Sequence, residues 1–254
     1  MRIYSWNVNG IRSAEVSFLS FIKNYKPDIL LLQEVRAHPD QISYFVKNIA
    51  GYNSFFNDSG RAGYGGTAVY YKKKLSIGVE TKLRFGILWD EGRCILIKIG
   101  DIYILNVYVP NGNSSEDRLE YKFKFYDDLT NLLSQWRKEG RKVVLGGDLN
   151  VAHTEKDLFA PQSARNSGFL KEEREWMSSI LDLGFIDTFR LFNQEGGNYT
   201  WWSMRDPTRK SNKGWRYDYL IVSEDLETRV KKSEILKDVF GSDHCPILMN
   251  ITSR

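Results

Sequence analysis

The stretch DILLLQE, residues 28–34, decides the fold class. Its four consecutive aliphatic side chains, Ile29 to Leu32, predict a β-strand that is buried on both faces. Such a strand needs a layer of structure on each side of its sheet. The strand delivers Glu34 into the interior, where an unpaired carboxylate would be costly. We therefore expect a cation or a hydrogen-bond donor to meet Glu34.

Short apolar runs rich in β-forming residues recur along the chain, with helical patterns between several of them. Strands are expected over residues 2–8, 28–34, 67–72, 94–99, 102–109, 142–148, 199–202, 217–222 and 246–251. Helices are expected over residues 13–25, 39–48, 115–138 and 171–183. This alternation predicts an α/β fold with a mixed sheet, or two packed sheets, covered by helices. No linker-like segment interrupts it, so we expect one domain over residues 1–254.

The composition is that of a soluble globular protein with a mildly basic balance, since the formal net charge is +4 at pH 7. This charge suits a polyanionic partner, although ordinary enzymes also show it. Cys94 lies in an apolar run and Cys245 beside a proline, which indicates neither a disulfide framework nor a zinc cluster. The first residues lack the apolar core of a signal peptide, and no run approaches a membrane span. We expect a cytoplasmic protein with no membrane partner, and nothing requires more than a monomer.

Several predicted strands end in a polar side chain that is followed within a few residues by turn-forming residues. These side chains are Asn7, Glu34, Tyr108 and Asp148, followed closely by Asn111 and Asn150, while Asp243 and His244 precede the last strand. Any one of them could simply terminate a strand as a turn former. Their coincidence across five strands favours a site, because sites in layered α/β proteins gather where strands end and loops begin.

The chemistry of these side chains indicates a hard metal ion. The candidate ligands are the oxygen donors Glu34, Asp148, Asp243, Asn7 and Asn150. Mg²⁺ or Mn²⁺ fits such a set better than zinc does, and usually keeps waters that a phosphate can replace. The sequence therefore points to a metal-assisted phosphoester reaction.

Asp243 and His244 are neighbours in the stretch GSDHCPILM (241–249). In an extended chain, adjacent side chains point to opposite faces. Asp243 is thus poorly placed to orient the imidazole ring of His244. If His244 takes part in chemistry, its orienting partner should come from a distant segment.

Eight blocks of the sequence, taken in order, resemble the exonuclease III family of apurinic/apyrimidinic (AP) endonucleases. They are SWNVNGIR (5–12), PDILLLQEVR (27–36), YVPNG (108–112), GGDLNVAHTEKDL (146–158), SGFLKEER (167–174), YTWWS (199–203), GWRYDYLIVS (214–223) and GSDHCPI (241–247). The resemblance runs from end to end and lies within the wider endonuclease/exonuclease/phosphatase superfamily. It implies a four-layer α/β sandwich of two packed β-sheets flanked by helices, with the site at one end of the sheets.

The resemblance implies a role for each candidate. Glu34 would be the principal Mg²⁺ ligand, steadied by Asn7, with Asp243 as a ligand or water-binder and Mn²⁺ able to substitute. Asp148 would position or deprotonate the attacking water and Asn150 would orient it, both close to the metal. Whether Asp148 or His244 is the general base stays open, with Asp148 favoured.

The scissile phosphate would be contacted by a second group of residues. Tyr108 and Asn111 would touch it, and His244 would hydrogen-bond it as an imidazolium. Asp218 of GWRYDY would be the distant acid that orients His244 and raises the pKa of its ring.

Recognition of DNA is expected to involve the stretch 201–216, which interleaves basic and aromatic residues. The resemblance implies that Trp201, Trp215 and Tyr217 wall a pocket for a flipped abasic sugar. The alternative for this stretch is a solvated loop. Tyr217 and Trp201 are bulkier than the residues of some relatives, which would alter lesion choice. The remaining expected DNA contacts are Arg12, Arg36, Asn166, Arg205 and the loop GRAGYGG (60–66), although this loop could equally be a simple turn.

The function so implied is a Mg²⁺-dependent nuclease that cuts duplex DNA 5′ to abasic sites and leaves a 3′-hydroxyl. Accompanying 3′→5′ exonuclease and 3′-phosphodiesterase activity is expected, with incision at damaged bases as an extension. Alternatives are a small-molecule phosphatase of the same superfamily, a secreted nuclease and an inactive binding module. The segment GWRYDYL counts against the phosphatase, and the poorly placed cysteines count against the secreted nuclease. The intact set of polar candidate residues counts against the inactive module.

Overall fold

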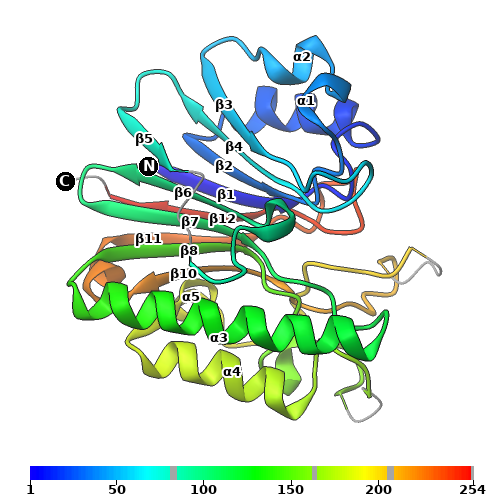
Figure 1. The fold of residues 1–254 in the computed structure, drawn as a ribbon, viewed down its shortest axis with the longest axis vertical. Helices are drawn as coiled ribbons and strands as arrows, with labels where there is room; N and C mark the ends of the chain where they lie inside the picture. The colour runs from blue at the N-terminus through cyan, green and yellow to red at the C-terminus, as the bar shows by residue number, and fades with distance from the viewer. Residues whose placement is uncertain (81–84, 162–164, 205–208, 253–254) are drawn as a thin grey trace.

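The computed structural model describes residues 1–80, 85–161, 165–204 and 209–252, and consists of two packed β-sheets with helices on both outer faces (Figure 1). The first sheet has the spatial order β11 (Val230–Ile235), β12 (Ile247–Ile251), β1 (Arg2–Asn7), β2 (Ile29–Gln33), β4 (Thr67–Lys72), β3 (Tyr52–Asn57). The second has the order β5 (Ile77–Glu80), β6 (Cys94–Ile99), β7 (Ile102–Tyr108), β8 (Lys142–Asp148), β10 (Asp218–Ser223), β9 (Phe185–Asp187). Both sheets are mixed, because β1–β2 and β7–β8 pair in parallel and the remaining pairs are antiparallel.

Helices form the two outer layers of the molecule (Figure 1). The first sheet is covered by α1 (Glu15–Tyr25) and α2 (Tyr44–Lys47), and the second by α3 (Glu116–Lys138) and α4 (Lys171–Asp182). The short helix α5 (Thr188–Phe192) follows β9 and contacts β10 and β11. The predicted four-layer α/β sandwich is therefore confirmed.

The run of aliphatic residues in β2 is buried on both faces, as predicted. Leu30 and Leu32 pack in the cluster that α1 shares with the first sheet, whereas Ile29 and Leu31 face the second sheet. A third apolar layer joins the second sheet to α3 and α4. Alternation along one strand thus supplies two of the three apolar layers, since successive side chains of a strand point to opposite faces.

The prediction for the longest helix is confirmed at both ends. The Ser115 hydroxyl accepts a hydrogen bond from the Arg118 backbone N–H at 3.2 Å and caps α3. After the helix, Gly140 adopts a φ of +68°, in the left-handed region that favours glycine.

A pair of buried amides joins the two sheets between their apolar side chains. Gln33 Nε2 donates to Asn106 Oδ1 at 2.7 Å, and Asn106 Nδ2 donates to the backbone oxygens of Leu32 and Ala68, both at 3.0 Å. Buried amides are costly unless they are hydrogen-bonded, so this inter-sheet amide pair favours one register of the sheets over others.

Two of the predicted elements are wrong. Residues 39–48 do not form one helix: a 3₁₀ turn at Pro39–Gln41 ends at Ile42, whose backbone is extended, and Ser43 caps a separate short helix, α2. Residues 199–202 form no strand of either sheet. In that stretch Trp201 makes isolated bridges to Trp215 and His244.

The strands β3, β5, β9 and β11 were not predicted, and they are the four edge strands of the two sheets. Edge strands keep a solvent-facing side, so they lack the continuous apolar runs that mark the central strands. Among the described residues, no helix combines the length and the apolar character needed to cross a bilayer.

Candidate active site

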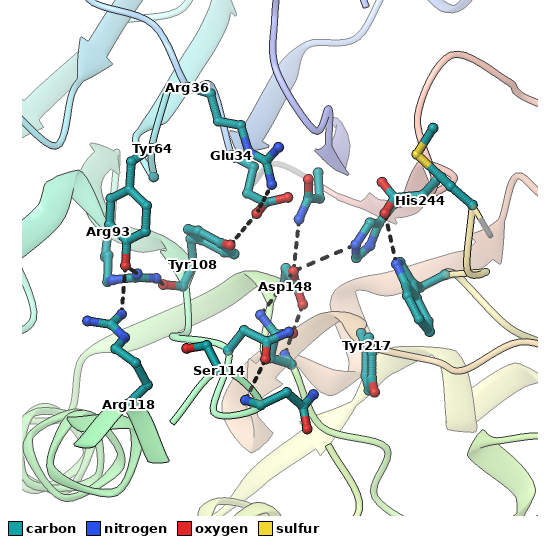
Figure 2. A pocket seen from close by; sticks show the side chains of 18 of the residues that line it. Glu34, Arg36, Tyr64, Arg93, Tyr108, Ser114, Arg118, Asp148, Tyr217 and His244 are labelled. Carbon is teal, nitrogen blue, oxygen red and sulfur yellow. Dashed lines mark hydrogen bonds and ion pairs between the residues drawn. The ribbon is translucent and has the colours of Figure 1, made fainter. Parts of the chain in front are cut away.

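Polar side chains from the ends of several strands line one cavity of about 850 Å³. Most of them lie at or just after the ends of β1, β2, β7 and β8, or just before the starts of β10 and β12. These two sets of strand ends meet because β10 is antiparallel to β8 and β12 is antiparallel to β1. The predicted site residues on its wall are Asn7, Glu34, Arg36, Tyr108, Asn111, Asp148, Asn150, Asn166, Trp201, Tyr217, Asp243 and His244. Figure 2 shows Glu34, Tyr108, Asp148 and His244 gathered around this shared space. Segments spread over the whole sequence therefore converge as predicted.

Asp148, the last residue of β8, lies at the centre of the site and is 1% exposed. Its Oδ2 accepts from Asn7 Nδ2 at 2.9 Å, and its Oδ1 accepts from the Asn150 backbone N–H at 2.9 Å. Burial is the largest influence on its pKa and raises it to about 7, against the opposing effect of the His244 charge. A carboxylate with a pKa near neutrality is suited to accept a proton at physiological pH.

His244 is paired with a carboxylate from a distant strand. Its Nδ1 lies 2.7 Å from Asp218 Oδ2, while its Nε2 is 3.9 Å from Asp148 Oδ2 and faces the cavity side. Burial alone would lower the pKa of His244, but the charges of Asp218 and Asp148 outweigh it and raise the pKa to about 10. The ring is therefore an imidazolium at neutral pH.

Asp243, the neighbour of His244 in sequence, is engaged elsewhere. Its Oδ1 accepts from Asn9 Nδ2 at 2.8 Å, and its Oδ2 accepts from Trp201 Nε1 at 3.0 Å. Ser242 Oγ also donates to Oδ1 at 3.1 Å. The two adjacent residues thus serve different partners, as the sequence predicted, although residues 241–243 form bends and not a strand.

Glu34 enters the cavity from a left-handed backbone conformation, with a φ of +52° directly after β2. A non-glycine residue in this region is uncommon and often marks a functional turn. Its Oε1 accepts hydrogen bonds from the Tyr108 hydroxyl and from Arg36 Nη2, the latter at 3.0 Å. Among the described residues none donates to Oε2, so one oxygen of the expected interior carboxylate stays open.

The donor set fits a hard divalent ion held mainly by one carboxylate. The described part of the chain has no group of three or more His, Cys, Asp or Glu side chains placed to hold a metal. Mg²⁺ needs no such cage, because it commonly binds through one or two carboxylates and completes its shell with waters and phosphate. Glu34 offers an open oxygen, and within the described part of the chain the Asn7 amide oxygen accepts only the Asn9 backbone N–H, at 3.0 Å. Both Asp243 oxygens already accept protein donors, which favours contact through a water.

An aromatic group forms one side of the cavity. Trp201 and Tyr217 line it, with ring centroids 5.5 Å apart, whereas Trp215 lies 5.4 Å from Tyr217 and is not on the cavity wall. Tyr217 is accommodated by Gly168, where an added Cβ would come within 2.4 Å of the phenol oxygen. Trp215 therefore supports the predicted pocket from behind instead of walling it.

Three of the remaining predicted DNA-contacting residues, Arg36, Asn111 and Asn166, line the cavity. Asn111 and Asn166 are exposed on its wall, and Arg36 is also on the wall but is paired with Glu34. Arg12 is exposed on the turn after β1 and does not line the cavity. Arg205 lies outside the described residues.

A cluster on the cavity wall joins Tyr64, from the expected contact loop 60–66, to two arginines that were not predicted, Arg93 and Arg118. Figure 2 shows Tyr64, Arg93 and Arg118 on the side next to Tyr108. All three contact Glu91. No local sequence pattern marks Arg93 and Arg118, because they come from separate segments and neither ends an apolar run. Position offers one signal: Arg93 directly precedes β6, the antiparallel partner of the strand that ends at Tyr108.

Comparison with known proteins identifies this arrangement. The model of the endonuclease/exonuclease/phosphatase family matches residues 4–244. This chain belongs to that family. Within it, the nuclease is of the exonuclease III type, an AP endonuclease/exodeoxyribonuclease that acts in DNA repair.

Individual relatives span nearly the whole chain. An exodeoxyribonuclease of Bacillus subtilis is 37% identical, covering 97% of this chain and 98% of the relative. A DNA-(apurinic or apyrimidinic site) endonuclease of Dictyostelium discoideum is 38% identical, covering 97% of this chain and 69% of the relative. A solved structure of a 3′ phosphatase from Neisseria bound to product DNA hairpin has a TM-score of 0.88 and 26% identity, with complete coverage of both chains. Members of the family are metal-dependent nucleases, and DNA is the substrate class.

Proposed function

We propose that this nuclease hydrolyses the phosphodiester bond 5′ to abasic sites in duplex DNA in a Mg²⁺-dependent reaction, leaving a 3′-hydroxyl and a 5′-deoxyribose phosphate. The same site removes blocking groups and nucleotides from 3′ ends, and its aromatic wall extends incision to damaged bases. The observation that carries the proposal is the meeting of two functional pairs across one cavity. Asp148 with His244 lies on one side, and Glu34 with Tyr108 on the other.

The proposed base is Asp148. Asn7 and Asn150 hold its two oxygens, so the carboxylate is fixed in direction before substrate binds. As a water attacks phosphorus, Asp148 takes its proton, the bond from phosphorus to the 3′ oxygen breaks, and the departing 3′ oxygen takes a proton from solvent to become the 3′-hydroxyl. A pKa of about 7 allows this carboxylate to be ionised before the step and to accept the proton during it.

His244 is the proposed electrostatic partner of the phosphate. Asp218 occupies Nδ1, which leaves the Nε2 proton for a non-bridging oxygen. Because the ring is already cationic, it stabilises developing negative charge without a further protonation step. In this proposal Asp148 is the general base and His244 is the hydrogen-bond donor to the phosphate. The sequence alone had left open which of the two is the base.

Glu34 and Asn7 are the proposed ligands of Mg²⁺, with Mn²⁺ as substitute and Asp243 holding a metal water. The bound ion supplies Lewis-acid neutralisation of the phosphate oxygens. The phenol of Tyr108 fixes the Glu34 carboxylate and remains beside the reacting phosphate. Asn111, on the same wall, adds a neutral donor.

Lesion selectivity is proposed to come from Trp201 and Tyr217. A nucleotide without a base leaves the helical stack at lower cost than an intact one, and its bare sugar can pack against aromatic faces. The Neisseria relative of the same fold, described as a 3′ phosphatase, supports the 3′-end activity in the proposal.

The test is an end-labelled duplex containing one tetrahydrofuran abasic analogue, incubated with the protein and Mg²⁺, Mn²⁺ or EDTA. We expect a single cut 5′ to the analogue with either metal, none in EDTA, and a product that a polymerase extends. A second duplex with a recessed 3′-phosphate should release phosphate under the same conditions. An intact abasic duplex at high enzyme concentration, with active 3′-end processing, would refute the endonuclease part alone.

A further inference from the structure

Arg93 is enclosed by protein on the wall of the catalytic cavity. It is 1% exposed, and each of its three guanidinium nitrogens donates to a partner within the chain. Nε donates to Glu91 Oε2 at 2.9 Å, Nη2 to the Tyr64 hydroxyl at 3.0 Å, and Nη1 to the Tyr108 backbone oxygen at 3.0 Å. A buried arginine with these bonds serves the fold of the site and is not a free donor for a ligand.

Three separate contacts join Arg93 to Tyr108. Besides the Nη1 bond, the Tyr108 backbone N–H donates to the Arg93 backbone oxygen at 2.8 Å. The guanidinium carbon also lies 4.8 Å from the centroid of the Tyr108 ring, a cation–π distance. Arg93 therefore holds Tyr108 by its backbone and by the face of its ring.

The far side of Arg93 is anchored by a network that spans the cavity wall. Glu91 accepts from Arg93 and from Arg118 of α3, and its Oε2 also accepts the Tyr64 hydroxyl at 3.0 Å. Figure 2 shows Tyr64, Arg93 and Arg118 stacked beside Tyr108 on this wall. Burial would raise the pKa of Glu91, but its bonds to Arg118 and Arg93 lower it to about 2, so it stays charged.

We propose that Arg93 is a positioning residue for the reaction: it directs the Tyr108 hydroxyl onto Glu34 Oε1 and so leaves Glu34 Oε2 facing the metal position. This inference rests on the proposed function of Glu34 as a metal ligand. If the phenol of Tyr108 could rotate away, Glu34 would lose that hydrogen bond and keep only the one from Arg36. The cation acts through Tyr108 and does not touch the substrate.

A double-mutant cycle tests this proposal. Arg93→Met and Arg93→Lys are made in the wild-type chain and in Tyr108→Phe. Arg137→Met is the matched control, because Arg137 is a partly buried arginine that pairs with Glu224 and Asp225 and does not line the cavity. In the Arg93 variants, Glu91 still has its ion pair with Arg118, so its charge stays compensated. Thermal melting checks that each variant folds. The readouts are kcat and KM on abasic duplex, and Mn²⁺ affinity from electron paramagnetic resonance without DNA.

We expect Arg93→Met to lower kcat about 10- to 100-fold with KM changed by less than about threefold, because orientation is lost and binding is not. Arg93→Lys should recover little of the lost kcat, since one ammonium group cannot make the three directed hydrogen bonds of the planar guanidinium. In Tyr108→Phe, Arg93→Met should lower kcat by less than about a further threefold, and Arg137→Met should leave kcat within about twofold of the wild type. Mn²⁺ affinity should weaken in Arg93→Met and not in Arg137→Met.

Equal losses of kcat from Arg93→Met in both backgrounds would overturn the proposal, as would a loss confined to KM. The Mn²⁺ titration needs no substrate, so it judges Arg93 even if abasic duplex is not cut. Unchanged Mn²⁺ affinity in Arg93→Met would overturn the link to Glu34 directly.

Discussion

Nδ1 of His244 lies 2.7 Å from Oδ2 of Asp218, although 26 residues separate the two in the chain. The short separation places an aspartate behind the ring and leaves Nε2 toward the cavity. Asp218 is the first residue of β10, and its buried position fixes the ring with little freedom. The charge and the direction of His244 thus depend on one carboxylate, which makes that pair the most direct point at which to test the site.

Asp218→Asn should lower kcat on abasic duplex by about 10²-fold or more while DNA binding is retained. Asparagine keeps the shape but removes the charge that raises the pKa of His244, so the imidazolium is lost at a lower pH. The activity of the variant should therefore decline with rising pH in a range where the wild type does not. Steady-state kinetics across pH and fluorescence anisotropy measure both effects. Asp225→Asn, at the surface, is the control, and wild-type turnover by Asp218→Asn would remove the proposed pairing.

Tyr217→Leu should reduce discrimination between abasic and undamaged duplex, measured as the ratio of kcat/KM values, by about tenfold or more. The phenol ring lines the cavity, so its removal weakens contacts made only with a flipped sugar. Trp215→Phe should change this ratio much less, because Trp215 lies behind Tyr217. If Trp215→Phe changed the ratio more than Tyr217→Leu, the recognition surface would have to be reassigned.

Lys122→Met should lower the free energy of unfolding by about 3–5 kcal/mol, since it leaves the buried Glu173 carboxylate unpaired. Lys122 Nζ lies 2.6 Å from Glu173 Oε1 with both side chains fully buried, and it also donates to the Asn150 backbone oxygen at 2.7 Å. Adding Glu173→Gln should recover part of the loss, because it removes the uncompensated charge. Urea denaturation measures each value.

The control for this pair is Lys142→Met, which breaks a partly exposed ion pair with Asp101. Its cost should be about 0–1 kcal/mol. Similar losses for Lys122→Met and Lys142→Met would show that burial of the charge is not the cause.

Glu91→Gln should reduce the dependence of stability on acid pH. The pKa of Glu91 is lowered to about 2 in the folded chain, so its stabilising contribution is present above its ordinary pKa and is lost as pH falls towards 2. The Tm difference between wild type and variant should be largest at neutral pH and shrink below about pH 4.5. Differential scanning fluorimetry from pH 7 to the acid limit records it, with exposed Glu195→Gln as control. A constant difference across pH would contradict this assignment.

The sequence predicted the central strands well and the edge strands poorly, for one physical reason. β2 and β8 are buried on both faces and show continuous apolar runs, whereas β3 and β11 keep a solvent-facing side. Residues 199–202 have strand-like composition, but propensity cannot say whether a neighbouring strand is available for pairing. The prediction of one helix over residues 39–48 was wrong because the Ser43 side chain accepts a hydrogen bond from the Val46 backbone N–H and so starts a new helix.

The site was predictable where a polar residue ends a buried run, as at Glu34 and Asp148. The partner of His244 was different: the expected alternation of side chains indicated that Asp243 was poorly placed, but only the resemblance to a family indicated Asp218. Arg93 escaped both approaches, because its contact with Tyr108 depends on the register in which β6 and β7 pair within the second sheet.

The inter-sheet amide pair limits how this scaffold can be remodelled. Gln33 precedes Glu34 directly, and Asn106 lies two residues before Tyr108, so the bond between the layers sits beside the residues that face each other in the cavity. Sliding one layer to admit a larger substrate would break that bond before it widened the opening. An engineer seeking new specificity should therefore graft loops at the rim and leave the strands unchanged.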